Sequence, residues 1–141
     1  MQQRKWARIL AVLFAVVLLV GQFLPDYQTT AYGDAKTEAD TNARPAIKAP
    51  LASVAQYDKI ILCYPIWWHT APMTVGTFLE HYDFTGKNIY PVSQSGSMDK
   101  SQYDQSVSFI KSCAKEAVVD AGIFSTDDLE IRTYINQIIR E

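Results

Sequence analysis

Residues 57–92 read YDKIILCYPIWWHTAPMTVGTFLEHYDFTGKNIYPV, and this stretch decides the fold. The short apolar run at residues 59–64 has the length and β-branched content of a strand buried on both faces. Pro72 favours the start of a helix, because the first turn of a helix does not need the N–H that proline lacks. Residues 88–93 predict a second strand, although Pro91 is unusual inside one. Between the two strands, apolar residues recur at helical spacing at Val75, Phe78, Leu79 and Tyr82.

The alternation of strands and helices continues to the C-terminus. Residues 117–124 predict a third strand. Apolar residues at helical spacing predict a helix on either side of it, carrying Tyr103, Val107, Ile110, Ala114 and Ala117 in the first and Ile131, Tyr134, Ile135, Ile138 and Ile139 in the second. Strands that alternate with helices predict a parallel sheet with helices on its faces. The predicted fold class is therefore α/β, a three-layer parallel sheet of about three strands with flanking helices.

The N-terminal part of the chain has a different composition. Three basic residues, Arg4, Lys5 and Arg8, precede twelve uninterrupted apolar residues at positions 9–20. The run matches the apolar core of a secretory signal, about 7–15 residues, and is shorter than the roughly 20 residues of a membrane-spanning helix. A retained anchor and a buried strand or helix stay open as alternatives. We therefore predict an N-terminal hydrophobic helix, a signal peptide or membrane anchor over residues 1–25, and an extracytoplasmic protein, secreted or membrane-anchored.

The remaining chain divides into two parts by polarity. Residues 26–43 are polar without apolar periodicity and predict a linker or loop, which leaves residues 44–141 as the folded domain. The formal net charge is −2, and such a chain lacks the basic surface of nucleic-acid-binding proteins, which excludes a nucleic-acid partner. His69 and His81 are too few and too far apart for a metal site, so no metal is predicted.

Two loops leave the predicted strands at one edge of the sheet, residues 64–72 and 93–100. In sheets of this kind ligands bind beyond the carboxyl ends of the strands. The first loop carries adjacent Trp67 and Trp68, which belong to no periodic element. Loop aromatics offer a flat apolar surface with a polar N–H at its edge, which suits a planar heteroaromatic ligand. From the residues alone, a hydrophobic plug over the sheet edge and a protein-contact patch are the alternatives.

The first loop and its surroundings resemble a known family. The sequence Tyr-Pro-Ile-Trp-Trp-His-Thr-Ala-Pro at residues 64–72 is similar to the Tyr-Pro-Ile-Trp-Trp-Gly-Thr-Ala-Pro loop of flavodoxin-like proteins, and the resemblance extends over residues 44–141. It implies a doubly wound sheet and FMN as the cofactor. The flavin-facing loops of that family fall on Pro65, Ile66, Trp67, Trp68, His69 and Thr70, and on Gln94, Ser95, Gly96 and Ser97.

The chain departs from the family pattern in ways that matter for binding. His69 stands where glycine is expected, which makes a backbone with positive φ more costly, and its side chain is expected to face solvent. The Ser/Thr-rich loop that holds the FMN phosphate has no counterpart, so the domain is a C-terminal half, and its affinity for FMN should be low. The strand at residues 59–64 then has an open edge, which favours self-association unless the N-terminal segment or another chain covers it.

The function predicted from these features is a flavodoxin-like, FMN-binding electron-transfer protein, exported or membrane-tethered, with an unidentified redox partner protein. It would be an electron carrier rather than a true catalyst. Two alternatives stay open. One is a truncated remnant that binds no FMN and acts as an interaction module. The other is a flavin-dependent reductase using NAD(P)H or quinone, for which the sequence has no Gly-rich dinucleotide motif.

Overall fold

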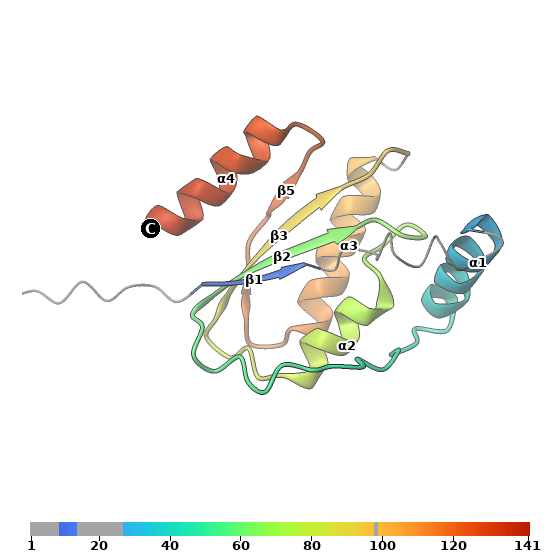
Figure 1. The fold of residues 1–141 in the computed structure, drawn as a ribbon, viewed down its shortest axis with the longest axis horizontal. Coiled ribbons are helices and arrows are strands. Elements are labelled where there is room, and N and C mark those ends of the chain that lie inside the picture. The colour runs from blue at the N-terminus through green and yellow to red at the C-terminus, as the bar shows by residue number, and fades with distance from the viewer. Residues whose placement is uncertain (1–8, 14–26, 98) are drawn as a thin grey trace, which may run out of the picture.

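A parallel sheet forms the centre of the computed structural model, which describes residues 9–13, 27–97 and 99–141. Two long strands, β2 (Lys59–Pro65) and β3 (Asn88–Gln94), pair over seven residues each. The short strands β4 (Val118–Val119) and β5 (Ile123–Phe124) both pair with β3 on its other side, and β1 (Ile9–Leu13) pairs with β2. The strand order is β1-β2-β3-β4, and every pairing is parallel (Figure 1).

Helices cover both faces of this sheet. α2 (Met73–His81) and α3 (Lys100–Cys113) lie on one face and α4 (Asp128–Arg140) lies on the other. A further helix, α1 (Tyr27–Asp40), lies beyond the carboxyl ends of the strands (Figure 1). The predicted three-layer α/β class is confirmed, and the predicted strands at residues 59–64 and 88–93 are β2 and β3.

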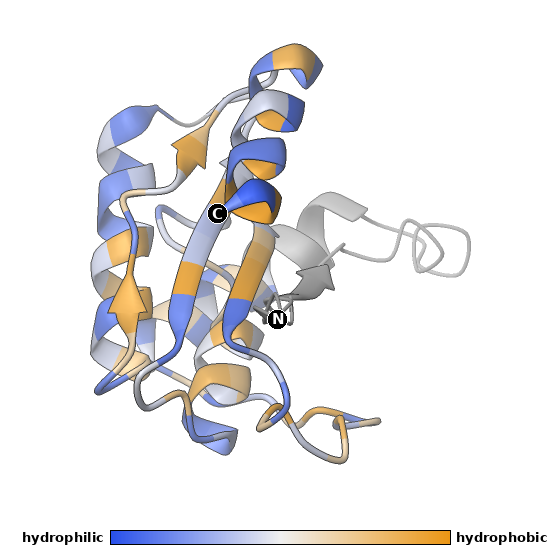
Figure 2. Cartoon of the chain, turned by 90° about the vertical axis from the view of Figure 1, so that its left-hand side faces the viewer, coloured by the Kyte–Doolittle hydropathy of each residue, from blue (hydrophilic) through white to orange (hydrophobic). Residues whose placement is uncertain are grey.

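The main core lies between the sheet and the helices α2 and α3. Because side chains alternate along a strand, Ile60, Leu62 and Tyr64 of β2 all point into it. They are joined by apolar residues of the two helices and of β3, namely Val75, Phe78, Leu79, Ile89, Tyr103, Val107 and Ile110. Figure 2 shows hydrophobic residues along the strands between the helices on either side. This core holds β2 and β3 in their register.

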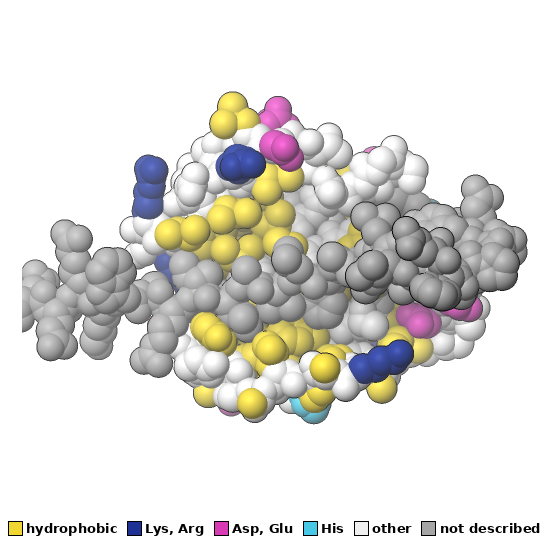
Figure 3. Space-filling view, in the orientation of Figure 1, with side chains coloured by type: hydrophobic (Ala, Val, Ile, Leu, Met, Phe, Trp, Pro, Cys, Tyr) yellow, Lys and Arg dark blue, Asp and Glu magenta, His cyan; other side chains and the backbone are white. Residues whose placement is uncertain are grey.

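The opposite face carries a smaller core. Ile61 of β2, Val92 of β3 and Ile138 of α4 are buried there. Of the described helices only α4 contributes to this cluster, and hydrophobic side chains gather beside α4 in the view of Figure 3. The side chain of the buried Lys59 of β2 reaches α4, where its Nζ donates to the Ile138 carbonyl at 2.8 Å. A cation bonded to a carbonyl of the last turn is favourable there, because the C-terminal end of a helix carries partial negative charge.

The predicted third strand, residues 117–124, is split into β4 and β5 by a turn at Asp120. The Asp120 carboxylate accepts from the Gly122 N–H at 2.8 Å, and Gly122 has a φ of +70°. A Cβ at Gly122 would lie 2.2 Å from the Pro91 carbonyl oxygen, so a side chain does not fit. β3 pairs with β4 at Ile89 and with β5 at Val92, and Pro91 therefore falls in the gap between the two short strands. This gap explains how a proline is accommodated in a central strand.

The N-terminal segment differs from the prediction where the structure describes it. Residues 9–13 form the strand β1 and not the predicted hydrophobic helix; residues 14–20 of the apolar run lie outside the described residues. β1 pairs with β2 from Ile9–Lys59 to Leu13–Cys63, so the edge of β2 that was predicted to be open is covered by the N-terminal segment. A short apolar run suits a buried strand as well as a helix, which is why periodicity alone did not separate them.

Residues 27–40 form α1, although residues 26–43 are predicted to be a linker or loop. The helix is mostly polar and lacks the apolar stripe by which helices are predicted from sequence. Lys36 and Asp40, one turn apart, form an ion pair on it. Within the described ranges, no helix has the length and apolar content needed to span a bilayer.

Replacing Lys59 by methionine tests the link between β2 and α4. We expect Lys59→Met to lower the free energy of unfolding by about 1.5–3 kcal/mol, the contribution of a hydrogen bond to a charged group. Chemical denaturation measures the change. Lys111→Met, an exposed lysine of α3, is the matched control and should change stability little. An unchanged stability in Lys59→Met would show that the bond to Ile138 contributes nothing.

Candidate functional site

Three loops meet at the carboxyl edge of the sheet. Pro65 and Gln94 are register partners at the ends of β2 and β3, so the two predicted flavin-facing loops begin side by side. The loop after β5 joins them, because the Ser125 N–H donates to the Ser93 carbonyl at 3.1 Å. Parallel pairing thus collects the loops of three strands at one place, where sheets of this type bind their ligands.

The first loop is a tight turn closed by the backbone. Trp67 N–H donates to the Thr70 carbonyl at 2.8 Å, and Thr70 N–H donates to the Trp67 carbonyl at 3.1 Å. The two central residues, Trp68 and His69, have φ values of +43° and +68°. Positive φ at both central positions is the pattern of a type I′ hairpin turn, which normally carries Asn or Gly.

The turn therefore stores backbone strain at two bulky residues. An L-residue in the left-handed region costs about 1–2 kcal/mol. The bulky Trp68 is an outlier there, whereas histidine is found there more often than most residues but without the freedom of glycine. The expectation that His69 occupies a position suited to glycine is confirmed by its φ. Strain of this kind persists only where the surroundings hold it, and it is concentrated at functional sites.

The aromatic side chains of the turn lie at the surface. Trp67 and Trp68 are half-buried and His69 is exposed, as predicted for its side chain. The Trp68 and His69 rings meet edge to face, with centroids 5.1 Å apart. Lys36 of α1 places its Nζ 5.0 Å from the centroid of the Trp68 ring. The indole pair thus forms an accessible aromatic surface with a cation beside it.

Buried residues support the turn from below. Ile66 and Ala71, on either side of the turn, are buried. Tyr64 lies at the end of β2, where its hydroxyl lies 2.8 Å from Ser106 Oγ. Because Ser106 Oγ itself donates to the Tyr103 carbonyl at 2.6 Å, the Tyr64 hydroxyl is the donor of this pair. Burial raises the pKa of Tyr64, so the hydroxyl keeps its proton at neutral pH.

The second loop is shaped by serine side chains. The buried Ser93 donates from Oγ to the Tyr64 carbonyl at 2.6 Å, which ties the end of β3 to the end of β2. Beyond it, Ser95 is half-buried, while Gln94, Gly96 and Ser97 are exposed. The loop ends at Asp99, which caps α3 by accepting from the Ser101 N–H at 2.7 Å. Polar side chains and backbone groups of this loop are therefore presented at the same edge as the indoles.

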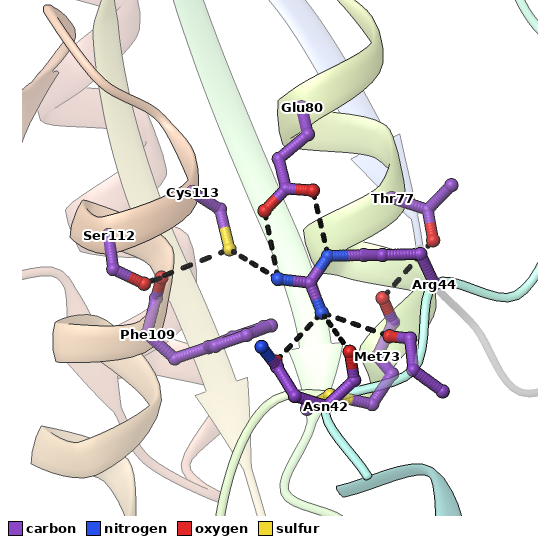
Figure 4. A network of polar contacts seen from close by, with 9 residues as sticks. Asn42, Arg44, Met73, Thr77, Glu80, Phe109, Ser112 and Cys113 are labelled. Carbon is purple, nitrogen blue, oxygen red and sulfur yellow. Dashed lines mark hydrogen bonds and ion pairs between the residues drawn. The ribbon is translucent and has the colours of Figure 1, made fainter.

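Arg44 fixes the segment that follows α1 (Figure 4). Its Nε and Nη2 donate to the two carboxylate oxygens of Glu80, both at 2.8 Å, and its Nη1 donates to the Asn42 carbonyl at 3.0 Å. The guanidinium also lies over the Phe109 ring of α3, 5.5 Å from its centroid. The hydrogen bonds from Arg44 lower the pKa of the Glu80 carboxyl. This bidentate pair fastens the chain just after α1 to both α2 and α3.

Comparison with known proteins places this arrangement in a family. The sequence profile of the flavodoxin family matches residues 27–137. The chain belongs to the flavodoxin family. No curated protein matches the chain. The flavodoxin match begins at α1, so the predicted linker lies largely inside the family's own span.

Solved structures of flavoproteins share the fold. A flavoprotein from Bacteroides uniformis superposes with a TM-score of 0.67 at 21% identity, covering 94% of this chain and 99% of that one. A flavoprotein from Bacteroides eggerthii gives a TM-score of 0.61 at 26% identity, covering 82% and 72%. A flavoprotein from Lactobacillus acidophilus, in complex with FMN, gives a TM-score of 0.57 at 21% identity, covering 82% and 74%.

The ten residues predicted to face a flavin all lie at this edge, and their role in binding stays a prediction. Ser93, Ser125 and Lys36 were not predicted to belong to the site. A signal for Ser125 exists in the sequence, because Ser-Thr-Asp at residues 125–127 follows the third strand at the same edge. Lys36 had no such signal, since its helix shows no apolar periodicity.

The strain at His69 can be measured directly. We expect His69→Gly to stabilise the protein by about 0.5–1 kcal/mol, because the strain relieved, about 1–2 kcal/mol, exceeds the extra chain entropy of glycine, about 0.4–1 kcal/mol. Denaturant unfolding measures it. Glu116→Gly, at a φ of +65° in the turn before β4, is the matched control remote from the site and should gain similarly. Destabilisation by His69→Gly alone would contradict the account, showing that the imidazole contributes more than its backbone costs.

Proposed function

We propose that this flavodoxin-family chain binds FMN at the carboxyl edge of its sheet and serves as an electron carrier. The observation that carries the proposal is the strained turn of Trp67 to Thr70, which presents two indoles beside the serine-rich loop after β3. A flat aromatic surface next to polar groups suits the isoalloxazine ring, which is apolar on its faces and polar at its edge.

The residues present fit the ring of the cofactor. Trp67 and Trp68 would stack on it or cap it, and Ser95, Gly96 and Ser97 would offer hydrogen bonds to its polar edge. When bound, the flavin supplies the redox chemistry, accepting and giving one or two electrons. The protein's own part is to hold the ring, to exclude water from its faces and to favour one redox state by its contacts.

Binding of the FMN phosphate has weaker support than binding of the ring. β1 ends at Leu13 and α1 begins at Tyr27, so residues 14–26 stand between the first strand and the following helix. Their sequence, FAVVLLVGQFLPD, contains no serine, threonine, lysine or arginine. Because charge-assisted hydrogen bonds to phosphate are strong, we expect FMN to bind more weakly here than in a flavodoxin with a hydroxyl-rich loop.

Export or membrane tethering, predicted from residues 1–25, is part of the proposal and has a structural consequence. Residues 9–13 cannot pair with β2 and lie in a bilayer at the same time. A form cleaved or inserted through this segment would lose β1 and expose the edge of β2 to a second copy of the chain or to another protein.

Trp fluorescence and flavin fluorescence together test FMN binding. In a Trp6→Phe background only Trp67 and Trp68 report, since the chain has three tryptophans. We expect added FMN to quench these indoles, and Trp68→Ala to weaken binding by about tenfold, as the loss of an aromatic contact predicts. Leu51→Ala, an exposed apolar residue before the amino end of β2, is the control and should bind as the parent does.

The same titration decides between the proposal and its rival. A folded parent protein that binds no FMN would contradict the proposal and favour a remnant that acts as an interaction module. The absence of hydroxyl-bearing residues from positions 14–26 is the observation that favours this second candidate.

A further inference from the structure

We propose that Ser93 is a positioning residue of the flavin site, whose buried hydroxyl holds the turn of Trp67 to Thr70 and the loop of Gln94 to Ser97 at the spacing at which FMN binds. The inference rests on the proposed binding of FMN. It concerns how the site is held in shape and not which ligand the site takes. Ser93 lies directly before the second stretch predicted to face the flavin and was not itself predicted to belong to the site.

Ser93 lies near the end of the strand that joins all three loops of the site. On one side it is in register with Tyr64 of β2, and on the other with Phe124, the last residue of β5. Each of these residues is at or next to the carboxyl end of its strand, and the loops begin immediately afterwards. A displacement at Ser93 therefore changes where the loops of the site start relative to one another.

Hydrogen bonds join Ser93 to both neighbouring strand ends. Its Oγ donates to the Tyr64 carbonyl at 2.6 Å, and its carbonyl accepts from the Ser125 N–H at 3.1 Å. The second of these bonds uses only the backbone, so it is available to any residue at position 93. The first bond depends on one hydroxyl group. The spacing between the first and second loops therefore depends on a side chain that a substitution can remove.

The burial of Ser93 determines the kind of role it can have. Its side chain is 2% exposed. A hydroxyl is costly to bury unless it is hydrogen-bonded, so the bond to the Tyr64 carbonyl is favoured whenever the strands are folded. The same burial keeps the hydroxyl away from a ligand, in contrast to the exposed Gly96 and Ser97. Ser93 therefore acts through the loops and not by contact with the flavin.

Loss of this bond is expected to lower the affinity for FMN. Without it, the turn that follows Tyr64 and the loop that follows Ser93 can adopt several spacings, and only some of them suit a ligand that contacts both. The apparent affinity then falls by the fraction of molecules that have the competent spacing. We expect a decrease of about fivefold, the factor that corresponds to the net contribution of one hydrogen bond.

Two pairs of full-length proteins, each differing by the hydroxyl, test the inference by FMN titration. We expect Ser93→Ala to bind FMN about fivefold more weakly than the parent. Ser93→Val should bind more weakly than Ser93→Thr by the same factor. Threonine and valine have nearly the same shape, so the cost of their extra methyl group cancels in this comparison, which also decides the matter if Ser93→Ala does not fold. Lys59→Met, at the amino end of β2, is the control for stability alone and should bind FMN as the parent does.

Amide NMR spectra without ligand give a second measurement that does not depend on FMN. We expect Ser93→Val, compared with Ser93→Thr, to shift the signals of residues 66–70 and 94–97, whereas Lys59→Met leaves them in place. Unchanged loop signals would overturn the positioning role of Ser93.

The titrations separate the two proposals. Equal FMN affinities within both pairs would overturn the role of Ser93 and leave the flavin site standing. A loss of affinity in Lys59→Met as large as that in Ser93→Ala would show that binding follows overall stability, which also overturns it. A folded parent that binds no FMN contradicts the flavin site itself, and with it any role of Ser93 in binding.

Discussion

The parallel pairing of β2 with β3 is the constraint on which the site depends. Seven register pairs, from Lys59–Asn88 to Pro65–Gln94, bring the ends of the two strands to the same level. The loops that follow the two strands therefore begin side by side. The hydrogen bond from Ser93 Oγ to the Tyr64 carbonyl fixes the distance between them. The core beneath the sheet, built on α2 and α3, stabilises that register and with it the place where a ligand can bind.

The packed core stabilises the protein, whereas the turn at the proposed site is strained. The turn from Trp67 to Thr70 adopts positive φ at two residues that disfavour it, and only a rigid base makes such strain tolerable. The base consists of the buried Ile66 and Ala71 and of the hydrogen-bonded Tyr64 and Ser106. If the sheet were less rigid, the turn would relax and the two indoles would lose their fixed positions. Part of the stabilisation from core packing therefore offsets the strained backbone of the turn.

The main strands, three of the helices and the position of the site could be predicted from the sequence. The strands at residues 59–65 and 88–94 and the helices α2, α3 and α4 carry strong apolar patterns, and the Trp-Trp loop marks the edge. Three features could not be predicted. β1 is a five-residue piece of a longer apolar run that also matches a targeting segment, α1 is a polar helix without an apolar stripe, and the break between β4 and β5 depends on Gly122 meeting Pro91 in space. Each of these depends on tertiary contacts and not on local pattern.

The central claim is that a flavin binds where the ends of β2 and β3 meet. Amide NMR spectra of the isotope-labelled chain during a titration with FMN test it most directly, because every loop reports separately. We expect the largest shifts at residues 66–70 and 94–97, and no change at the amino ends of the strands. Shifts confined to the outer surface of α4 or to the amino edge of the sheet, or no shifts in a folded protein at saturating FMN, would contradict it.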